Sequence, residues 1–159
     1  MTYIKKHFVF VLLFSALSMN SRLAYADEIV SAKEPEAILN VAKGFGSASL
    51  DRDSDGDPMI IGRVEGTKYV IFFYGGNNVN QGKEDIKFYA YWNKKGVPLS
   101  EINNWNSNKR FGKASIDKDG DTVLTMDVNL KYGVTAKNLE DTFLWWKAVI
   151  LAFTKEVIN

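Results

Sequence analysis

The sequence predicts one α+β domain, in which a mostly antiparallel sheet of five to six strands packs with three helices. The first observation is the order of the patterns, because three helical segments are separated by short segments that alternate like strands. The second is that short turns rich in Gly and Asp join most of the strand segments, which favours hairpins. Only the middle helix is therefore placed to cross over between strands.

The first 26 residues read as a cleavable secretory signal peptide. After a basic start, an apolar run covers residues 8–19, and Ala24 and Ala26 are the small residues that a signal peptidase requires. Twelve apolar residues are too few for a spanning helix, which needs about 20. We expect cleavage after Ala26, no membrane span afterwards, and a periplasmic or secreted domain of residues 27–159, a normal length for one domain.

Cleavage changes the chemistry that the chain can perform. It removes three of the 20 basic residues and none of the 19 acidic ones, so the net charge goes from +1 to −2 and gives no reason to expect nucleic acid as a partner. The chain has no cysteine, and its one histidine, His7, leaves with the signal. Nucleophilic Ser-His-Asp and Cys-His sites and the usual zinc ligands are excluded, and we expect neither enzymatic activity nor a cofactor.

The mature chain opens with a predicted helix. Residues 27–33 read as a loose, exposed N-terminus. Over residues 34–46 the pattern is helical, with Pro35 in the first turn, apolar residues on one face and two glycines at the end.

Strands follow this helix. A short strand over residues 48–50 precedes two longer ones over 59–64 and 68–74, and Glu65 and Gly66 between them signal a tight hairpin. The strand over 68–74 is apolar on both faces, so we expect it to be central and covered on both sides.

The middle of the chain continues the sheet after a Gly/Asn-rich loop. The pattern predicts a strand over 85–92, a helix over 98–110, and a hairpin of strands over 111–117 and 122–130. The inner side of this helix is expected to carry its apolar residues, Leu99, Ile102 and Trp105.

The last helix is predicted over residues 135–158, with Thr135 as its N-cap. Its apolar stripe, with steps of three and four, consists of Leu139, Phe143, Trp146, Ile150, Phe153 and Val157. The helix is also apolar on its other side, where Trp145 stands with Leu144 and Ala148. A helix whose outer side faces water carries polar and charged residues there. We therefore expect a partner or a second copy to cover Trp145.

Three stretches together resemble the YbjN-domain family, described as bacterial sensory transduction regulators. They are Asp55-Gly-Asp-Pro58 leading into Phe73-Tyr-Gly75, then Ile102-Asn-Asn-Trp-Asn106 with Lys109-Arg-Phe-Gly112, then Met126-Asp-Val-Asn-Leu130 ahead of a Trp-bearing helix. The likeness covers nearly the whole mature chain. It implies a fold similar to the type III secretion chaperones, which commonly dimerise and bind extended segments of partner proteins, and a binding or regulatory module that is not a known enzyme.

One departure from the family pattern bears on function. Exported members often carry two cysteines, where this chain has Gly76 and Lys83 thereabouts. A disulfide-based clamp or redox role is therefore absent from what the resemblance implies.

An acidic turn has the Asp-x-Asp-x-Asp-Gly spacing of a calcium loop. Its carboxylates are those of Asp51, Asp53, Asp55 and Asp57. Gly62 stands where the twelfth-position glutamate belongs, and the flanks read as strands. We favour a hairpin turn whose Asp side chains bond backbone N–H groups, and the same reading for a second acidic turn over residues 117–121.

The most distinctive polar and aromatic group comprises Asn103, Trp105, Asn106 and Arg110. In a functional reading these residues grasp a partner's backbone or carboxylates. In the structural reading, which we favour, Trp105 fills the core, the two amides satisfy strand-edge backbone, and Arg110 pairs with an acidic turn. Tyr89 and Tyr91, on the wetter face of their strand, are the other candidate binding residues.

The leading hypothesis is an exported, non-enzymatic binding module that recognises a protein or peptide segment through a sheet edge or an aromatic surface, with a homodimer expected. A calcium-sensitive structural or accessory periplasmic protein is the alternative. A hydrolase that uses paired carboxylates ranks below both.

Overall fold

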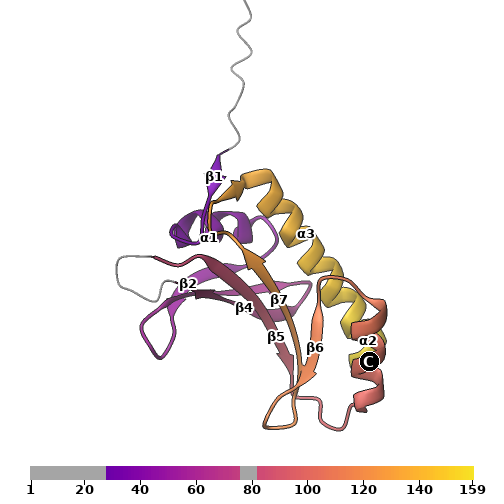
Figure 1. The fold of residues 1–159 in the computed structure, drawn as a ribbon. Coiled ribbons are helices and arrows are strands. Elements are labelled where there is room, and N and C mark those ends of the chain that lie inside the picture. Colours follow the sequence, from indigo (N-terminus) through magenta and orange to yellow (C-terminus); the bar gives the residue numbers. More distant parts are fainter. Residues whose placement is uncertain (1–27, 76–81) are drawn as a thin grey trace, which may run out of the picture.

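Six antiparallel strands form the central sheet of the structure, a computed structural model that describes residues 28–75 and 82–159. The sheet and three helices confirm the α+β class (Figure 1). The expected signal peptide and most of the Gly/Asn-rich loop, Gly76 included, lie outside the described residues.

The strands follow the order β2-β3-β4-β5-β7-β6, so β2 and β6 are the two edges, and every neighbouring pair is antiparallel. Their bounds are Ala48–Arg52 (β2), Pro58–Val64 (β3), Thr67–Tyr74 (β4), Asp85–Trp92 (β5), Lys113–Ile116 (β6) and Thr122–Asn129 (β7). Helix α2 (Leu99–Asn108) joins β5 to β6, and β7 returns between these two strands. The middle helix is therefore the crossover, as the sequence predicts.

The turn between β3 and β4 confirms the predicted hairpin. Glu65 and Gly66 have φ values of 48° and 82°. Two positive φ values in a row are typical of a type I′ turn, whose twist matches that of the flanking strands.

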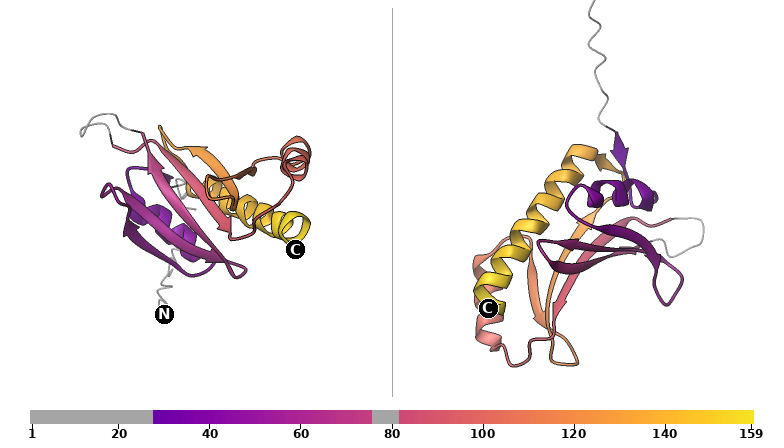
Figure 2. Two further views of the ribbon diagram at one scale, coloured as in Figure 1. Left: turned by 90° about the horizontal axis from the view of Figure 1, so that it is seen from below. Right: turned by 180° about the vertical axis from the view of Figure 1, so that it is seen from behind.

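Helices α1 (Pro35–Lys43) and α3 (Ala136–Phe153) pack on one face of the sheet, and α2 lies beside β6 (Figures 1 and 2). The expected cap opens α3, because Thr135 Oγ1 accepts a hydrogen bond from the Asn138 N–H at 3.2 Å. A π-helical turn, Thr154–Ile158, follows α3. Within residues 28–75 and 82–159, no helix combines the length and the apolar character that crossing a membrane requires.

The apolar stripe of α3 packs against the sheet as predicted. All of its members are buried: Leu139, Phe143, Trp146, Ile150, Phe153 and Val157. The ring of Phe88 on β5 meets two of them, with centroids 5.0 Å from Phe143 and 5.2 Å from Trp146. Each such side chain contributes about 1.5–3 kcal/mol by its burial, so this layer holds helices and sheet together.

In α2, two of the three apolar residues expected on the inner side face inwards. Ile102 and Trp105 are buried, whereas Leu99 is 74% exposed. Leu99 is the first residue of the helix, ahead of the turn that packs on the core.

The segment expected to be a loose N-terminus is ordered instead. Strand β1 (Ile29–Val30) pairs antiparallel with β8 (Val134–Thr135), and the Ala136 N–H donates to the Glu28 oxygen at 2.8 Å. Val30 is buried in the core. A strand of two residues has no periodicity, so only its burial against α3 and β8 reveals it.

Strand β4 lies in the middle of the sheet, as predicted, but one of its faces is open. Tyr69, Ile71 and Phe73 are buried under the helices. On the other side Phe72 is half-buried and Tyr74 is 46% exposed. The expectation that both faces of this strand are covered is wrong for the described part of the chain, because all three helices pack on the same side of the sheet or beside it.

Candidate functional site

Every second residue of β3, β4 and β5 points to the side of the sheet opposite α1 and α3. Seen from below, the strands lie in front of these helices (Figure 2, left). We call the apolar and aromatic residues on this side the open face. They are Met59, Ile61, Val70, Phe72, Tyr74, Tyr89 and Tyr91.

The aromatic rings of the open face form one connected group. The ring centroid of Phe72 lies 6.4 Å from that of Tyr74 and 6.0 Å from that of Tyr89, which lies 6.3 Å from that of Tyr91. Burial raises the pKa of Tyr89, with a smaller contribution from the Asp117 carboxylate. Tyr91 is 53% exposed, so the group presents flat aromatic surface to solvent.

Cationic side chains stand beside these rings. Lys87 Nζ lies 5.0 Å from the ring centroid of Tyr74 and 3.4 Å from Asp127 Oδ1. Arg63 on β3 and Lys68 on β4 are exposed on the same side, where they lie opposite each other in the strand register. Protein interfaces are enriched in aromatic residues, Met and Arg, and a cation beside an aromatic ring is attracted by the face of that ring.

The β6 edge of the sheet is closed by a side chain of α2. Asn106 Nδ2 donates to the Ala114 oxygen at 3.0 Å, and Asn106 Oδ1 accepts from the Ala114 N–H at 2.8 Å. The N–H and the C=O of Ala114, which point out of the sheet, are therefore both hydrogen-bonded.

The β2 edge is free. The Ser47 oxygen accepts from the Arg63 N–H at 2.9 Å. The backbone N–H and C=O groups of the odd-numbered residues of β2 therefore point towards β3. Because the direction of hydrogen bonding alternates along an antiparallel strand, the backbone groups of Ala48 and Leu50 point away from the sheet. No strand of the described residues pairs with this side of β2. A hollow of about 340 Å³ on the open face, lined in part by Ile61, lies next to it.

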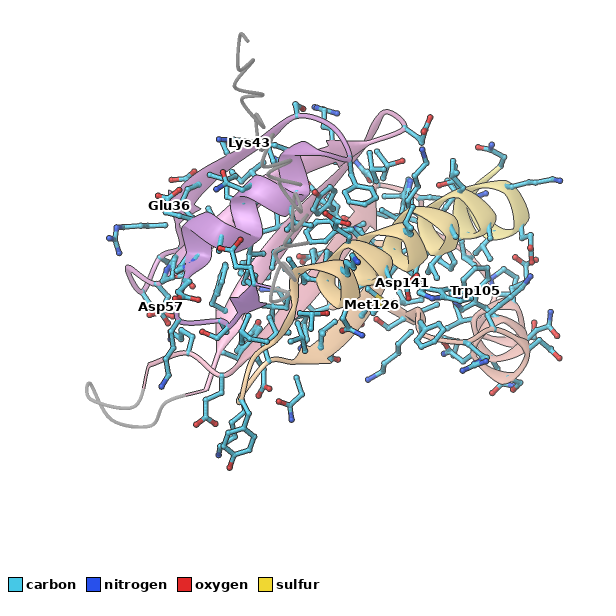
Figure 3. All side chains as sticks on the ribbon, turned by 90° about the horizontal axis from the view of Figure 1, so that it is seen from above. Glu36, Lys43, Asp57, Trp105, Met126 and Asp141 are labelled. Carbon is cyan, nitrogen blue, oxygen red and sulfur yellow. The ribbon has the colours of Figure 1, made fainter. Side chains whose placement is uncertain are left out.

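Trp105 takes the structural role that the sequence analysis favours. Its Nε1 donates to the Gly112 oxygen at 3.0 Å, and its ring centroid lies 4.8 Å from that of Phe153 on α3. Figure 3 shows it beside the C-terminal half of α3. At 3% exposed, the Trp105 ring offers no surface to a partner, and with Asn106 it fixes α2 against β6.

The other two members of that group are at the surface. Asn103 is exposed on α2. The Arg110 guanidinium lies 4.9 Å from the ring centroid of Phe111, in place of the expected pairing with an acidic turn.

Both acidic turns have the same hairpin geometry. Asp53 Oδ1 accepts from the N–H groups of Asp55 and Asp57, each at 2.9 Å. Asp117 Oδ1 accepts in the same way from Asp119 and Asp121, again at 2.9 Å. This is the turn that the sequence analysis favours over a calcium loop.

The register of the strands places the two turns at opposite ends of the sheet, because β3 begins beside the end of β4 and β7 begins beside the end of β5. They cannot share an ion. In the described part of the chain, no three acidic side chains come close enough together to hold a metal. Asp57 is instead paired with Lys83, whose Nζ lies 2.5 Å from Asp57 Oδ2.

Glutamates that a hydrolase would need as a pair are separated and paired with lysines. Glu65 Oε1 lies 2.5 Å from Lys147 Nζ, and Glu84 Oε2 lies 3.3 Å from Lys131 Nζ. These contacts are surface ion pairs, which contribute little to stability and show no arrangement of two facing carboxyls.

Trp145 faces away from the core, as predicted. It is 45% exposed, whereas Trp146 beside it is buried. The Phe111 ring lies against Trp145 with a centroid distance of 4.7 Å. The outer side of α3 is thus a second apolar surface, separate from the open face.

Sequence reasoning finds Tyr89 and Tyr91 on the open face but misses the residues from the two neighbouring strands. Met59, Ile61 and Phe72 read as core residues when each strand is taken alone. The signal is the strand order, because a patch forms only where β3, β4 and β5 lie side by side.

The sequence comparisons agree with the resemblance. No curated protein matches the chain. A family model described as "YbjN: Putative bacterial sensory transduction regulator" matches residues 34–159, from the start of α1 to the last residue. The chain therefore belongs to the YbjN family.

Proposed function

We propose that this protein is an exported, non-enzymatic binding module of the YbjN family that recognises an extended polypeptide segment on the open face and the β2 edge. The observation that carries the proposal is the open face itself. The helices bury one side of the sheet and leave a connected aromatic group on the other. Contiguous exposed apolar surface of this kind marks interaction sites in soluble proteins.

An extended polypeptide suits the site better than a compact ligand. A segment that adds to β2 finds the backbone groups of Ala48 and Leu50 for hydrogen bonding, and its alternate side chains fall beside Ser49, at the hollow that Ile61 lines in part. At about 4.8 Å per strand, the part of the segment that pairs with β2 lies about 14 Å from β4 and about 19 Å from β5, so the residues that follow it cross the open face to reach Tyr74 and Tyr91. Backbone bonds at β2 then supply affinity, and the contacts with the aromatic rings supply selectivity.

Export is the part of the proposal that rests on the N-terminus. The first described strand begins at Ile29, so a cut after Ala26 leaves the whole described fold intact. The protein recovered from the periplasm should then begin at Asp27.

The non-enzymatic part rests on the family and on the side chains of the site. The family description is that of a regulator. The open face offers tyrosine hydroxyls and lysines, and Lys87 is engaged with Asp127 and the Tyr74 ring.

The test measures peptide affinity for the protein and for open-face variants. Linear peptides are selected from a phage-displayed library, and the dissociation constant of the best peptide is measured by fluorescence anisotropy. Changing both Tyr74→Ser and Tyr91→Ser removes exposed rings without touching the core. We expect the dissociation constant to rise about tenfold or more, which corresponds to the loss of a central aromatic contact.

The control is Tyr132→Ser. Tyr132 is 91% exposed and lies outside the open face, after β7. Equal affinities for the wild type, the double variant and the control would contradict the proposed site, and a library that yields no binding peptide would contradict the proposed function.

A further inference from the structure

The outer side of α3 has an unusual sequence of side chains. At about 100° per residue, all residues within about 60° of Ala148 face away from the core. They are Lys137, Asp141, Leu144, Trp145, Ala148, Leu151, Ala152 and, at the start of the following turn, Lys155. Leu144 is 54% exposed and Leu151 45%. We call this set the outer stripe. It has an apolar centre, with Lys137 and Asp141 towards its N-terminal end and Lys155 towards its C-terminal end.

Two copies of the outer stripe are complementary to each other when the two α3 helices run antiparallel. Ala148 lies midway between Asp141 and Lys155, and also midway between Trp145 and Leu151. Two antiparallel copies that cross at Ala148 therefore bring Asp141 of each copy level with Lys155 of the other. Asp141 then meets Lys155 at both ends of the contact, and Lys137 lies one turn further out, level with Asn159 of the other copy. A parallel arrangement would place Asp141 against Asp141 and Lys155 against Lys155.

The side chains at the crossing suit a close approach. Ala148 is small, so two helix backbones can come near each other there. A groove of about 350 Å³ lies between α3 and the end of α2, lined in part by Arg110, Ala148 and Ala152. In the antiparallel arrangement Trp145 of the second copy lies close to Ala152, so a large ring meets a small residue at the groove.

A strained residue extends the same surface. Phe111 has a φ of 68°, in the left-handed region that bulky residues rarely adopt. Its ring is 47% exposed and lies 4.7 Å from Trp145 between centroids. Backbone strain that holds a large apolar ring at the surface, next to another exposed ring, is typical of an interaction site.

We propose that two copies of this chain form an antiparallel homodimer through the outer stripe of α3, with ion pairs between Asp141 and Lys155 at both ends. Figure 3 labels Asp141 on α3, on the helix side of the sheet. The open face lies on the other side of the sheet, so this dimer leaves it free. The proposal goes beyond polypeptide recognition and does not depend on it.

The test is a charge-exchange series measured by sedimentation equilibrium on protein purified from cells that express the full chain. Asp141→Lys and Lys155→Glu each place like charges at both ends of the dimer, and each should raise its dissociation constant about tenfold. The combined variant carries opposite charges again and should return to within about threefold of the wild type. Adding salt should weaken the wild-type dimer and strengthen the single variants.

Two further variants separate this surface from others. Ala148→Glu puts two charges at the crossing and should give a monomer at all concentrations. Leu99→Glu, at an exposed apolar position on α2, should leave the dimer unchanged. A monomeric wild type, a dimer that survives Ala148→Glu, or a combined variant no tighter than the single ones would overturn the proposal. Thermal unfolding followed by circular dichroism confirms that each variant is folded.

Discussion

Tyr69 lies in the core directly over Gly62 of the neighbouring strand. A Cβ atom at Gly62 would come within 2.3 Å of Tyr69 Cζ, so only glycine leaves room for the ring. The ring also lies 6.3 Å from both Phe88 and Trp146, measured between centroids. Burial raises the pKa of Tyr69 to about 12. The ionised phenol is therefore strongly disfavoured in the folded protein.

This shift predicts a loss of stability in alkali. Because the pKa in the folded state lies above the unfolded value of about 10, Tyr69 contributes fully below pH 10, and its contribution is lost as the pH rises from 10 to 12. Tyr69→Phe cannot ionise. We expect the free energy of unfolding of the variant, relative to wild type, to increase by about 3 kcal/mol over this range, measured by urea denaturation at several pH values. A constant difference between the two proteins would contradict the assignment.

Asp53 and Asp117 show why the acidic turns were ambiguous in sequence. Calcium loops and Asp-rich hairpin turns share the same residue types at close spacing. In both turns one aspartate oxygen, on Asp53 or on Asp117, accepts two backbone N–H groups, which is the geometry of a hairpin turn. The missing twelfth-position glutamate favours the turn from sequence alone, but the position of the two turns at opposite ends of the sheet requires the strand register.

At the scale of elements, the two edge strands β2 and β6 are treated differently. Free strand edges invite pairing with other chains, and proteins block them with side chains or covering elements. Asn106 does this at β6, while the outward groups of β2 are left open. The β6 edge therefore has a structural role, whereas the β2 edge can accept hydrogen bonds from, and donate them to, another strand.

Replacing Asn106 with Ala should weaken the attachment of α2 to β6. Two hydrogen bonds to the Ala114 backbone are lost, so we expect the free energy of unfolding to fall by about 1–2 kcal/mol in urea denaturation. Asn103→Ala, at an exposed position of the same helix, is the matched control and should change it by less than about 0.5 kcal/mol. Equal stabilities of the two variants would show that the Asn106 bonds do not hold this edge.

Periodicity predicts most elements, because α3 and strands β3 to β5 are long enough to repeat their pattern. Periodicity does not predict very short elements, or which way the first residues of an element face. The β1 strand has two residues, and Leu99 stands in the first turn of its helix, so neither has neighbours in sequence that fix its face. Burial of β1 and exposure of Leu99 are decided by tertiary contacts that no local pattern contains.

At the scale of the whole molecule, two apolar surfaces lie on opposite sides of one core. The outer stripe follows from sequence, since Trp145 and Trp146 cannot both face the sheet. The open face does not, because it takes residues from three strands whose adjacency comes only from the fold. The apolar character of β4 on both sides predicts that both are covered, whereas the described residues cover only one of them.

The central claim is that an extended polypeptide adds to β2 and lies against the open face. Amide hydrogen exchange followed by NMR, with and without a saturating selected peptide, tests it most directly. We predict that the Leu50 amide exchanges rapidly in the free protein and slows at least tenfold in the complex, together with shifts at Tyr74 and Tyr91. An unchanged Leu50 amide in the saturated complex, with shifts confined to α3, would contradict the account.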